Sequence, residues 1–377
     1  MKKSIKLNNL IILLVVLTFS LQSCKKSVDY IAYNGNIYTV NNDFDKASAF
    51  AVKDGIFIDV GDDKILSKYN TKEKINLNES TVLPGLIDAH CHFYGLGLNQ
   101  NVIDLTGTNS FNEILEKISL NDDKNVIRGR GWDQNDWEIK IFPNKTKLDL
   151  LYPNTPVVLE RIDGHAYLVN QRALEIAKID VNTKVDNGTI IIENGKLTGV
   201  LIDGPMSLID RAFGEVSLDD KIKALLSAQE ICFKHGLTTV DDAGLSKDVI
   251  LLVDSLQKQK KLKMRIYAMI SNIENDVNYF LKSGPIKTNS LNVRSVKVYG
   301  DGALGSRGAT LKEPYSDDKH NYGKLVTDIE SIKILAKKLS DANFQMNTHA
   351  IGDSTVNILI KAYSKVLKNK TDPRWRI

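Results

Sequence analysis

Short apolar segments with the character of β-strands alternate with amphipathic helical segments over most of this chain. The expected strands are Val82–His90, Leu237–Asp242, Met264–Ser271, Ser295–Gly300 and Phe344–His349. The helical runs between them include Lys221–Phe233, Val249–Lys258 and Ile329–Ala342. Because strand–helix–strand units at this spacing form parallel sheets with right-handed crossovers, the pattern predicts an α/β fold.

One long interval breaks this rhythm. Roughly residues 104–219 separate the first expected strand from the second, far more than a usual strand–helix loop. The interval predicts an inserted subdomain, which carries Gly129-Arg-Gly-Trp-Asp-Gln134 and Arg161-Ile-Asp-Gly-His165. In a β/α barrel, an insertion after the carboxyl end of a strand lies on the catalytic face, so we expect a substrate lid.

The segment from about residue 25 to 83 has a different character. Its β-rich stretches are punctuated by Asn34-Gly35 and Asp54-Gly55, dipeptides that are typical of hairpin turns. This pattern predicts a small antiparallel β domain.

The first 24 residues resemble an export signal. Lys2, Lys3 and Lys6 precede the apolar run Leu10–Leu17, which is too short for a comfortable membrane span. The run leads to Leu21-Gln-Ser-Cys24, which resembles the lipobox of bacterial lipoproteins. We therefore expect an exported lipoprotein of the cell envelope, anchored to a membrane by acyl chains on Cys24. An uncleaved anchor helix or a plain secretory signal is the alternative.

Composition excludes several other classes of protein. With 377 residues, 42% of them apolar and 25% charged, the chain is neither disordered, collagen-like nor a multi-span membrane protein. The formal charge of +4 falls by three, to +1, without the three lysines of the signal. Such a near-neutral body gives no electrostatic reason to expect nucleic acid as a partner. Three cysteines cannot form a disulfide scaffold.

Two histidines end the first expected strand. Side chains alternate along a strand, so His90 and His92 point the same way and can reach one metal ion. Neutral imidazole suits zinc and similar divalent ions. The alternative is a pair of polar residues at a strand end.

Lys297 lies within another expected strand. Val296 and Val298 share the face suited to helices, whereas Lys297 and its neighbours Ser295 and Tyr299 face inward. A buried lysine is costly unless it is paired or neutral. Reaction with CO₂ would make it a carbamate that bridges two cations. The alternatives are a lysine that reaches solvent and a lysine paired with an inward carboxylate such as that of Asp241.

A third candidate histidine, His349, ends the last expected strand, and Asn347 shares its face. Alone, it could equally be a hydrogen-bonded core histidine. Its position at the same end of the sheet as the other candidates favours a metal site. His235 and His320 lie elsewhere, one just ahead of a strand and the other in a polar loop.

Together these segments resemble the amidohydrolase superfamily, specifically its YtcJ-like (amidohydrolase-3) branch. The resemblance covers nearly everything after the signal. It rests on Asn34-Gly-Asn-Ile-Tyr, Leu83-Pro-Gly-Leu-Ile-Asp-Ala-His-Cys-His, Gly131-Trp-Asp, Asp163-Gly-His, Gly236-Leu-Thr-Thr-Val, Lys297-Val-Tyr-Gly-Asp-Gly-Ala-Leu-Gly-Ser-Arg307 and Thr348-His-Ala-Ile-Gly-Asp353.

The resemblance implies an incomplete TIM-type β/α barrel over residues 84–377 beside a partial β-sandwich over residues 25–83. It also implies one or two divalent metal ions, with zinc preferred, held by His90, His92, a carboxylated Lys297 and His349. A metal-activated hydroxide would cleave a C–N bond of an amide, cyclic amide or N-substituted formamide.

Four further residues occupy family motif positions and are expected on the substrate side: Trp132, Asp133, His165 and Arg307. Other roles stay open for three of them. The tryptophan could simply be packed, the histidine hydrogen-bonded in the core, and Arg307 paired with an acid on a neighbouring loop.

The chain departs from the family pattern at its end. It stops at Ile377, where the resemblance implies a sixth barrel strand with a further histidine ligand and, later, the aspartate that acts as general base. We therefore expect that this sequence is a truncated piece of a longer protein. By itself the piece should be inactive, with no general base among these residues. A homo-oligomer is compatible with the sequence.

The sequence suggests three rival functions. A non-catalytic binding lipoprotein on a decayed amidohydrolase scaffold is the main alternative. A dinucleotide site is suggested by Gly300-Asp-Gly-Ala-Leu-Gly305, but the following residues read as a loop where a helix is needed. A glycosidase requires two opposed carboxylates, and nothing pairs the available aspartates.

Overall fold

The computed structural model describes residues 25–120, 125–185, 187–213 and 216–377, and the chain divides into two compact units between Leu86 and Ile87. The expected signal and Cys24 lie outside the described residues. Within them, no helix is both long and apolar enough to cross a membrane.

The first unit consists of short strands and one helical turn. Four strands form one sheet in the order β6-β5-β2-β8, three form a second in the order β4-β3-β9, and β1 pairs with β7. The elements are β1 (Lys26–Ser27), β2 (Tyr30–Tyr33), β3 (Asn36–Tyr38), β4 (Lys46–Ala47), β5 (Ala49–Lys53), β6 (Ile56–Gly61), α2 (Ile65–Lys68), β7 (Tyr69–Asn70), β8 (Glu73–Asn76) and β9 (Thr81–Val82).

Alternating residues of β5 bury both faces of the larger sheet. Ala51 packs in one cluster with Ile65 of α2, whereas Phe50 packs in another with Ile37 of the second sheet. The unit is thus a small two-layer β structure.

Only one of the two predicted hairpins is present among the described strands. Asp54-Gly55 joins the antiparallel strands β5 and β6, as predicted. Asn34-Gly35 instead connects β2 to β3, which belong to different sheets. The prediction of a purely antiparallel domain was also wrong, because β2 pairs with β8, and β3 with β9, in parallel. Long-range strand pairing, which turn residues do not encode, decides this topology.

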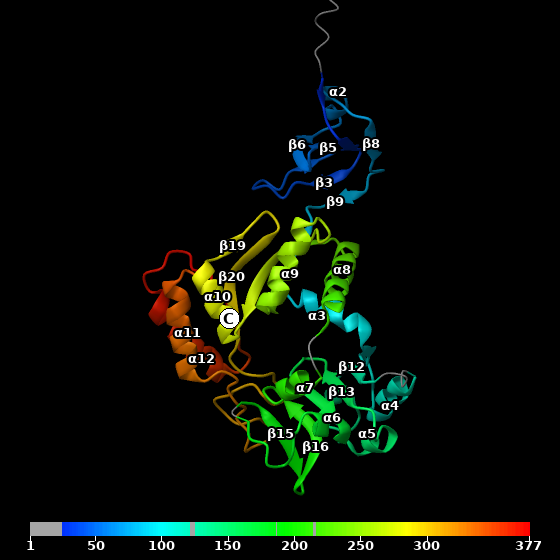
Figure 1. The fold of residues 1–377 in the computed structure, drawn as a ribbon. Helices are drawn as coiled ribbons and strands as arrows, with labels where there is room; N and C mark the ends of the chain where they lie inside the picture. Colours follow the sequence, from blue (N-terminus) through cyan, green and yellow to red (C-terminus); the bar gives the residue numbers. More distant parts are fainter. Residues whose placement is uncertain (1–24, 121–124, 186, 214–215) are drawn as a thin grey trace, which may run out of the picture. The chain divides into compact units, whose positions relative to one another are not determined.

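The second unit contains a largely parallel sheet flanked by helices (Figure 1). Its strands are β10 (Leu86–Cys91), β17 (Leu237–Leu245), β18 (Arg265–Ser271), β20 (Leu291–Tyr299) and β21 (Gln345–His349), in that order, with β19 (Ile286–Lys287) antiparallel to β20. The helices that alternate with them are α3 (Phe93–Leu98), α8 (Leu218–Lys234), α9 (Lys247–Lys258), α10 (Glu274–Ser283), α11 (Ile329–Asp341) and α12 (Asp353–Leu367). This alternation confirms the α/β fold of an incomplete β/α barrel.

The two faces of β20 are used as predicted. Val296 and Val298 are fully buried in the core that also holds helical residues such as Leu339. Lys297 lies on the opposite face and is 3% exposed. The apolar side chains of β20 therefore pack against the helices, whereas its polar side chains lie on the opposite, inner face of the curved sheet.

The expected insertion forms its own six-stranded sheet, in the order β11-β12-β13-β14-β16-β15, with its own hydrophobic core. Its elements are β11 (Ile103–Asp104), α4 (Phe111–Ser119), β12 (Ile127–Trp132), α5 (Thr146–Leu151), β13 (Val157–Arg161), β14 (Ala166–Val169), α6 (Gln171–Ile176), β15 (Thr189–Glu193), β16 (Lys196–Ile202) and α7 (Met206–Ala212).

Helix α3, which directly follows His92, packs tightly on α8. A Cβ atom added at Gly97 would lie 1.9 Å from the carbonyl oxygen of Ala224. Gly97→Ala should therefore lower the free energy of unfolding by about 2 kcal/mol or more, measured by urea denaturation. Gly95→Ala in the same helix is the matched control, because its nearest neighbour would lie at an ordinary 3.5 Å. Equal stability of the two variants would contradict this account of the packing.

Candidate metal centre

His90 and His92 lie side by side at the end of β10. The strand ends at Cys91 and His92 directly precedes α3, yet the two rings remain neighbours, with centroids 6.0 Å apart. Burial, followed by the charge of Lys297, lowers the pKa of both imidazoles, that of His92 to about 4. Both rings are therefore neutral at pH 7, the form in which imidazole binds metal.

A buried carboxylate that sequence reasoning missed fixes the segment after His92. Asp242 of β17 is 1% exposed and accepts a hydrogen bond from the backbone N–H of Tyr94 at 2.9 Å. Burial raises the pKa of Asp242 to about 7. Nothing around Asp242 in the sequence indicates that it meets the start of α3.

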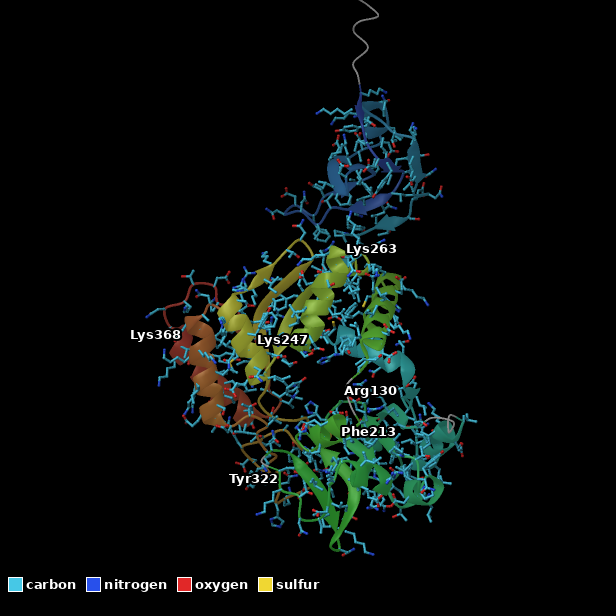
Figure 2. The ribbon with its side chains drawn as sticks, viewed as in Figure 1. Arg130, Phe213, Lys247, Lys263, Tyr322 and Lys368 are labelled. Carbon is cyan, nitrogen blue, oxygen red and sulfur yellow. The ribbon has the colours of Figure 1, made fainter. Side chains whose placement is uncertain are left out.

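Arg130 also acts on this region from the insertion. Figure 2 labels it on β12, where its Nε atom lies 3.1 Å from Oε1 of Glu160. After burial, Lys297 and His90, the charge of Arg130 is a further cause that lowers the pKa of His92. One side of the insertion is thus close enough to the end of β10 to influence it electrostatically.

Lys297 is the most unusual group of the site. Its side chain has no hydrogen bond or ion pair among the described residues, and Nζ lies 5.0 Å from the ring centroid of Tyr299. Burial lowers its pKa to about 8. Neither alternative use of this lysine matches the geometry, because the side chain is buried and Asp241 pairs instead with Arg376, at 2.9 Å.

His349 ends β21, directly beside Tyr299 of β20. Its Nε2 atom lies 3.2 Å from the carbonyl oxygen of Gly302. Burial lowers the pKa of His349, and Lys297 contributes to the lowering. If Nε2–H donates to this carbonyl, the lone pair of Nδ1 is free for a metal, as in many metal-binding histidines.

The insertion brings His165 next to His349. The two ring centroids are 5.0 Å apart, and Nδ1 of His165 lies 2.6 Å from Oδ1 of Asp203. Burial opposes protonation of His165, but the hydrogen bond and charge of Asp203 outweigh it and raise its pKa. Sequence reasoning missed Asp203, which follows β16 with no motif around it. It also left Tyr299 without a role, although this residue shares the strand face of Lys297.

The structure places Trp132 and Asp133 within the packing of the insertion. Trp132 is fully buried and its Nε1–H donates to the carbonyl of Leu159 at 2.9 Å. Asp133 and Asp163 both pair with the guanidinium of Arg161, which is 2% exposed. These contacts match the packed-tryptophan alternative and give Asp133 a structural partner.

Arg307 and Asn347 have contrasting surroundings. Arg307 pairs with Asp317 at 2.7 Å, which is the neighbouring-loop contact named as its alternative. Asn347 is 4% exposed and adjoins Lys297 in the strand register, yet neither polar atom of its side chain has a hydrogen-bond partner among the described residues.

The donor atoms suit a divalent metal. Over the described part of the chain, no three His, Cys, Asp or Glu side chains gather closely enough to hold an ion. The three candidate histidines therefore form no such group by themselves, and the fourth candidate, Lys297, is the residue whose charge acts on His90, His92 and His349 alike. Neutral imidazoles and an unpaired, easily deprotonated amine fit this type of site.

The loop after β20 does not form a dinucleotide site. Residues 300–328, all of them described, contain no helix. The side chain of Asp301 in this glycine-rich segment is buried and accepts four hydrogen bonds, one from Thr310 in the same loop and three from residues 351–355. The loop lacks the helix N-terminus that would hold a pyrophosphate.

Comparisons with known proteins show which family this chain resembles. Residues 73–376 match a model of the amidohydrolase family. YtcJ of Bacillus subtilis (strain 168), named as an amidohydrolase, is 33% identical over 89% of this chain and 66% of its own length. N-substituted formamide deformylase of Arthrobacter pascens is 23% identical over 90% of this chain and 66% of its own length. The chain thus spans slightly less than two thirds of both relatives.

A solved structure of an uncharacterized metal-dependent hydrolase from Pyrococcus horikoshii OT3 is also similar. It has a TM-score of 0.68 and 25% sequence identity, and the match covers 89% of this chain and 68% of that one. The fold of the described residues therefore agrees with the family model, which spans most of the chain. The protein belongs to the amidohydrolase family.

Proposed function

We propose that the full-length protein hydrolyses a C–N bond of an amide, a cyclic amide or an N-substituted formamide. One or two divalent ions, with zinc preferred, would be held by His90, His92, a carboxylated Lys297 and His349. The observation that carries the proposal is Lys297, which is 3% exposed, has no polar partner among the described residues and influences three histidines electrostatically.

The chemistry of these residues supports the proposal. The neutral amine of Lys297 would attack CO₂, forming an N–C bond and releasing one proton, and the resulting carbamate is an anion that can bind cations. The imidazoles need no deprotonation before they bind metal, because burial already keeps them neutral. A bound divalent ion supplies activation of water near neutral pH and polarises the carbonyl of the substrate.

The names of the two relatives support the bond class. One is described as an amidohydrolase and the other as a deformylase of N-substituted formamides. Both names refer to cleavage at the nitrogen of an amide-type group.

We also propose that the protein is attached to the cell envelope through acyl chains on Cys24.

Metal analysis combined with an amide panel tests this function. The full-length protein, purified without chelator, should contain one or two zinc-like ions per chain and hydrolyse at least one amide, cyclic amide or formamide. Removal of the metal should abolish hydrolysis, and added zinc should restore it. A protein that takes up no divalent metal and cleaves none of these compounds would instead be a binding protein on the same scaffold.

A further inference from the structure

A β-bulge separates two neighbouring side chains at the end of β12. Arg130 lies opposite Glu160 of β13 in the strand register and Trp132 lies opposite Arg161, so one extra residue, Gly131, stands between the two pairs. Gly131 has a φ of +114°, a conformation that other residues rarely adopt. Side chains two residues apart on a regular strand share a face, but here Trp132 is buried in the core of the insertion and Arg130 stays half-exposed. Bulges of this kind re-aim side chains and are frequent next to active sites.

The guanidinium of Arg130, labelled in Figure 2, lies beside the turn that carries His165. A Cβ atom added at Gly164 would lie 3.8 Å from its Nη2 atom. The next residue, His165, has its ring 5.0 Å from that of His349, measured between centroids. The charge of Arg130 also acts on the imidazole of His92, at the end of β10. Arg130 therefore stands on the wall of the insertion that borders the candidate metal centre.

Part of this guanidinium has no partner within the protein. Its Nε atom lies 3.1 Å from Oε1 of Glu160, and Nη2–H donates to the carbonyl of Ile162 at 3.2 Å. Among the described residues, Nη1 donates no hydrogen bond, although a guanidinium has five N–H donors. The side chain of Arg130 is 34% exposed, whereas that of Arg161, which two aspartates hold, is 2% exposed. Arg130 is thus anchored on one edge and accessible on the other.

Carboxylates suit such a free guanidinium edge, because its N–H groups match the two carboxylate oxygens. We propose that Arg130 binds a carboxylate on the substrate, and that the bond cleaved belongs to an amide, cyclic amide or formamide that carries this anionic substituent. Glu160 and the carbonyl of Ile162 hold the guanidinium in place from the side of the insertion. The inference rests on the proposed function and narrows it to negatively charged substrates.

Amide pairs that differ only in a carboxylate replaced with a methyl group test this preference, for example 3-formamidobenzoate and 3-methylformanilide. The full-length, metal-loaded wild type should favour the carboxylate member by about 10²-fold in kcat/KM. Arg130→Met, which keeps most of the side-chain length but loses the donors, should bring this ratio to within about threefold of one, mainly through KM. Arg172→Met is the matched control and should leave the ratio unchanged, because Arg172 lies in α6 of the same insertion, is 45% exposed and pairs with Glu175 at 3.5 Å. A wild-type ratio near one, or a ratio that survives Arg130→Met, overturns the inference.

Binding to the metal-free, full-length protein separates this inference from the proposed function. NMR titration should show that 3-formamidobenzoate binds at least about tenfold more tightly than 3-methylformanilide to the wild type and to Arg172→Met, but not to Arg130→Met. If Arg130→Met does not fold, Arg130→Lys replaces it and should also lose most of the preference, because an ammonium lacks the planar fork. Equal binding of both compounds to the wild type overturns the inference, even where amides are hydrolysed and the proposed function holds. If the carboxylate binds through Arg130 but no amide is cleaved, the proposed function fails and the anion site stands.

Discussion

Lys297→Met should remove most of the bound metal and lower hydrolysis by about 10³-fold or more. The substituted side chain has a similar length but cannot react with CO₂, so the anion proposed to hold the cations is lost. The wild-type amine is 3% exposed and has no polar partner among the described residues. Metal content by mass spectrometry and the rate on the best amide of the panel are the measurements.

The same variant should not be less stable than the metal-free wild type. Replacing a buried, unpaired amine with an apolar group of similar shape removes a desolvation cost, so the free energy of unfolding in urea should stay equal or rise. A loss of metal without a loss of stability separates a ligand role from simple misfolding. Lys333→Met, at an exposed lysine of α11 that is paired with Glu330, is the control and should change neither property. Full metal occupancy in Lys297→Met would contradict the proposed site.

Asp301→Ala should lower the free energy of unfolding by about 4 kcal/mol or more, measured by urea denaturation. The fully buried carboxylate accepts hydrogen bonds from the backbone N–H groups of Thr310, Ile351 and Gly352 and from the hydroxyl of Thr355, at 2.8–3.0 Å. Its removal would leave all four donors unsatisfied in the interior, at about 1–3 kcal/mol each before relaxation.

Asp353→Ala provides the comparison for this prediction. Asp353 lies nearby at the start of α12 and also accepts a backbone hydrogen bond, from Lys312, but its side chain is 57% exposed. Water can replace the lost acceptor there, so a cost below about 1 kcal/mol is expected. If the two aspartates prove equally dispensable, the carboxylate of Asp301 does not hold together the loops that follow β20 and β21.

The sequence was most informative where residue patterns are local. Alternation along the strand predicted that Lys297 faces away from Val296 and Val298, and the observed burial confirms this. The strand that ends at His349 was also located to within one residue at its start. Such features depend on the periodicity of one segment and on the polarity of its neighbours.

Contacts between distant segments could not be predicted in this way. Nothing near Asp203 in the sequence indicates that it meets His165, because the contact depends on how β14 and β16 pair within the insertion. Arg161 is a further example, since its buried position is explained by carboxylates on two different turns. The mixed strand order of the first unit has the same origin, because its parallel pairs join residues as far apart as Tyr30 and Glu73, or Asn36 and Thr81.

Anomalous diffraction at the zinc edge from crystals of the metal-loaded, full-length protein tests the central claim most directly. We predict a peak within about 2.0–2.2 Å of ring nitrogens of His90 and His92 and of an oxygen of carboxylated Lys297, with His349 bound to the same ion or to a second one about 3.5–4 Å away. A peak away from these residues, or an unmodified Lys297 beside a fully occupied ion, would contradict the account.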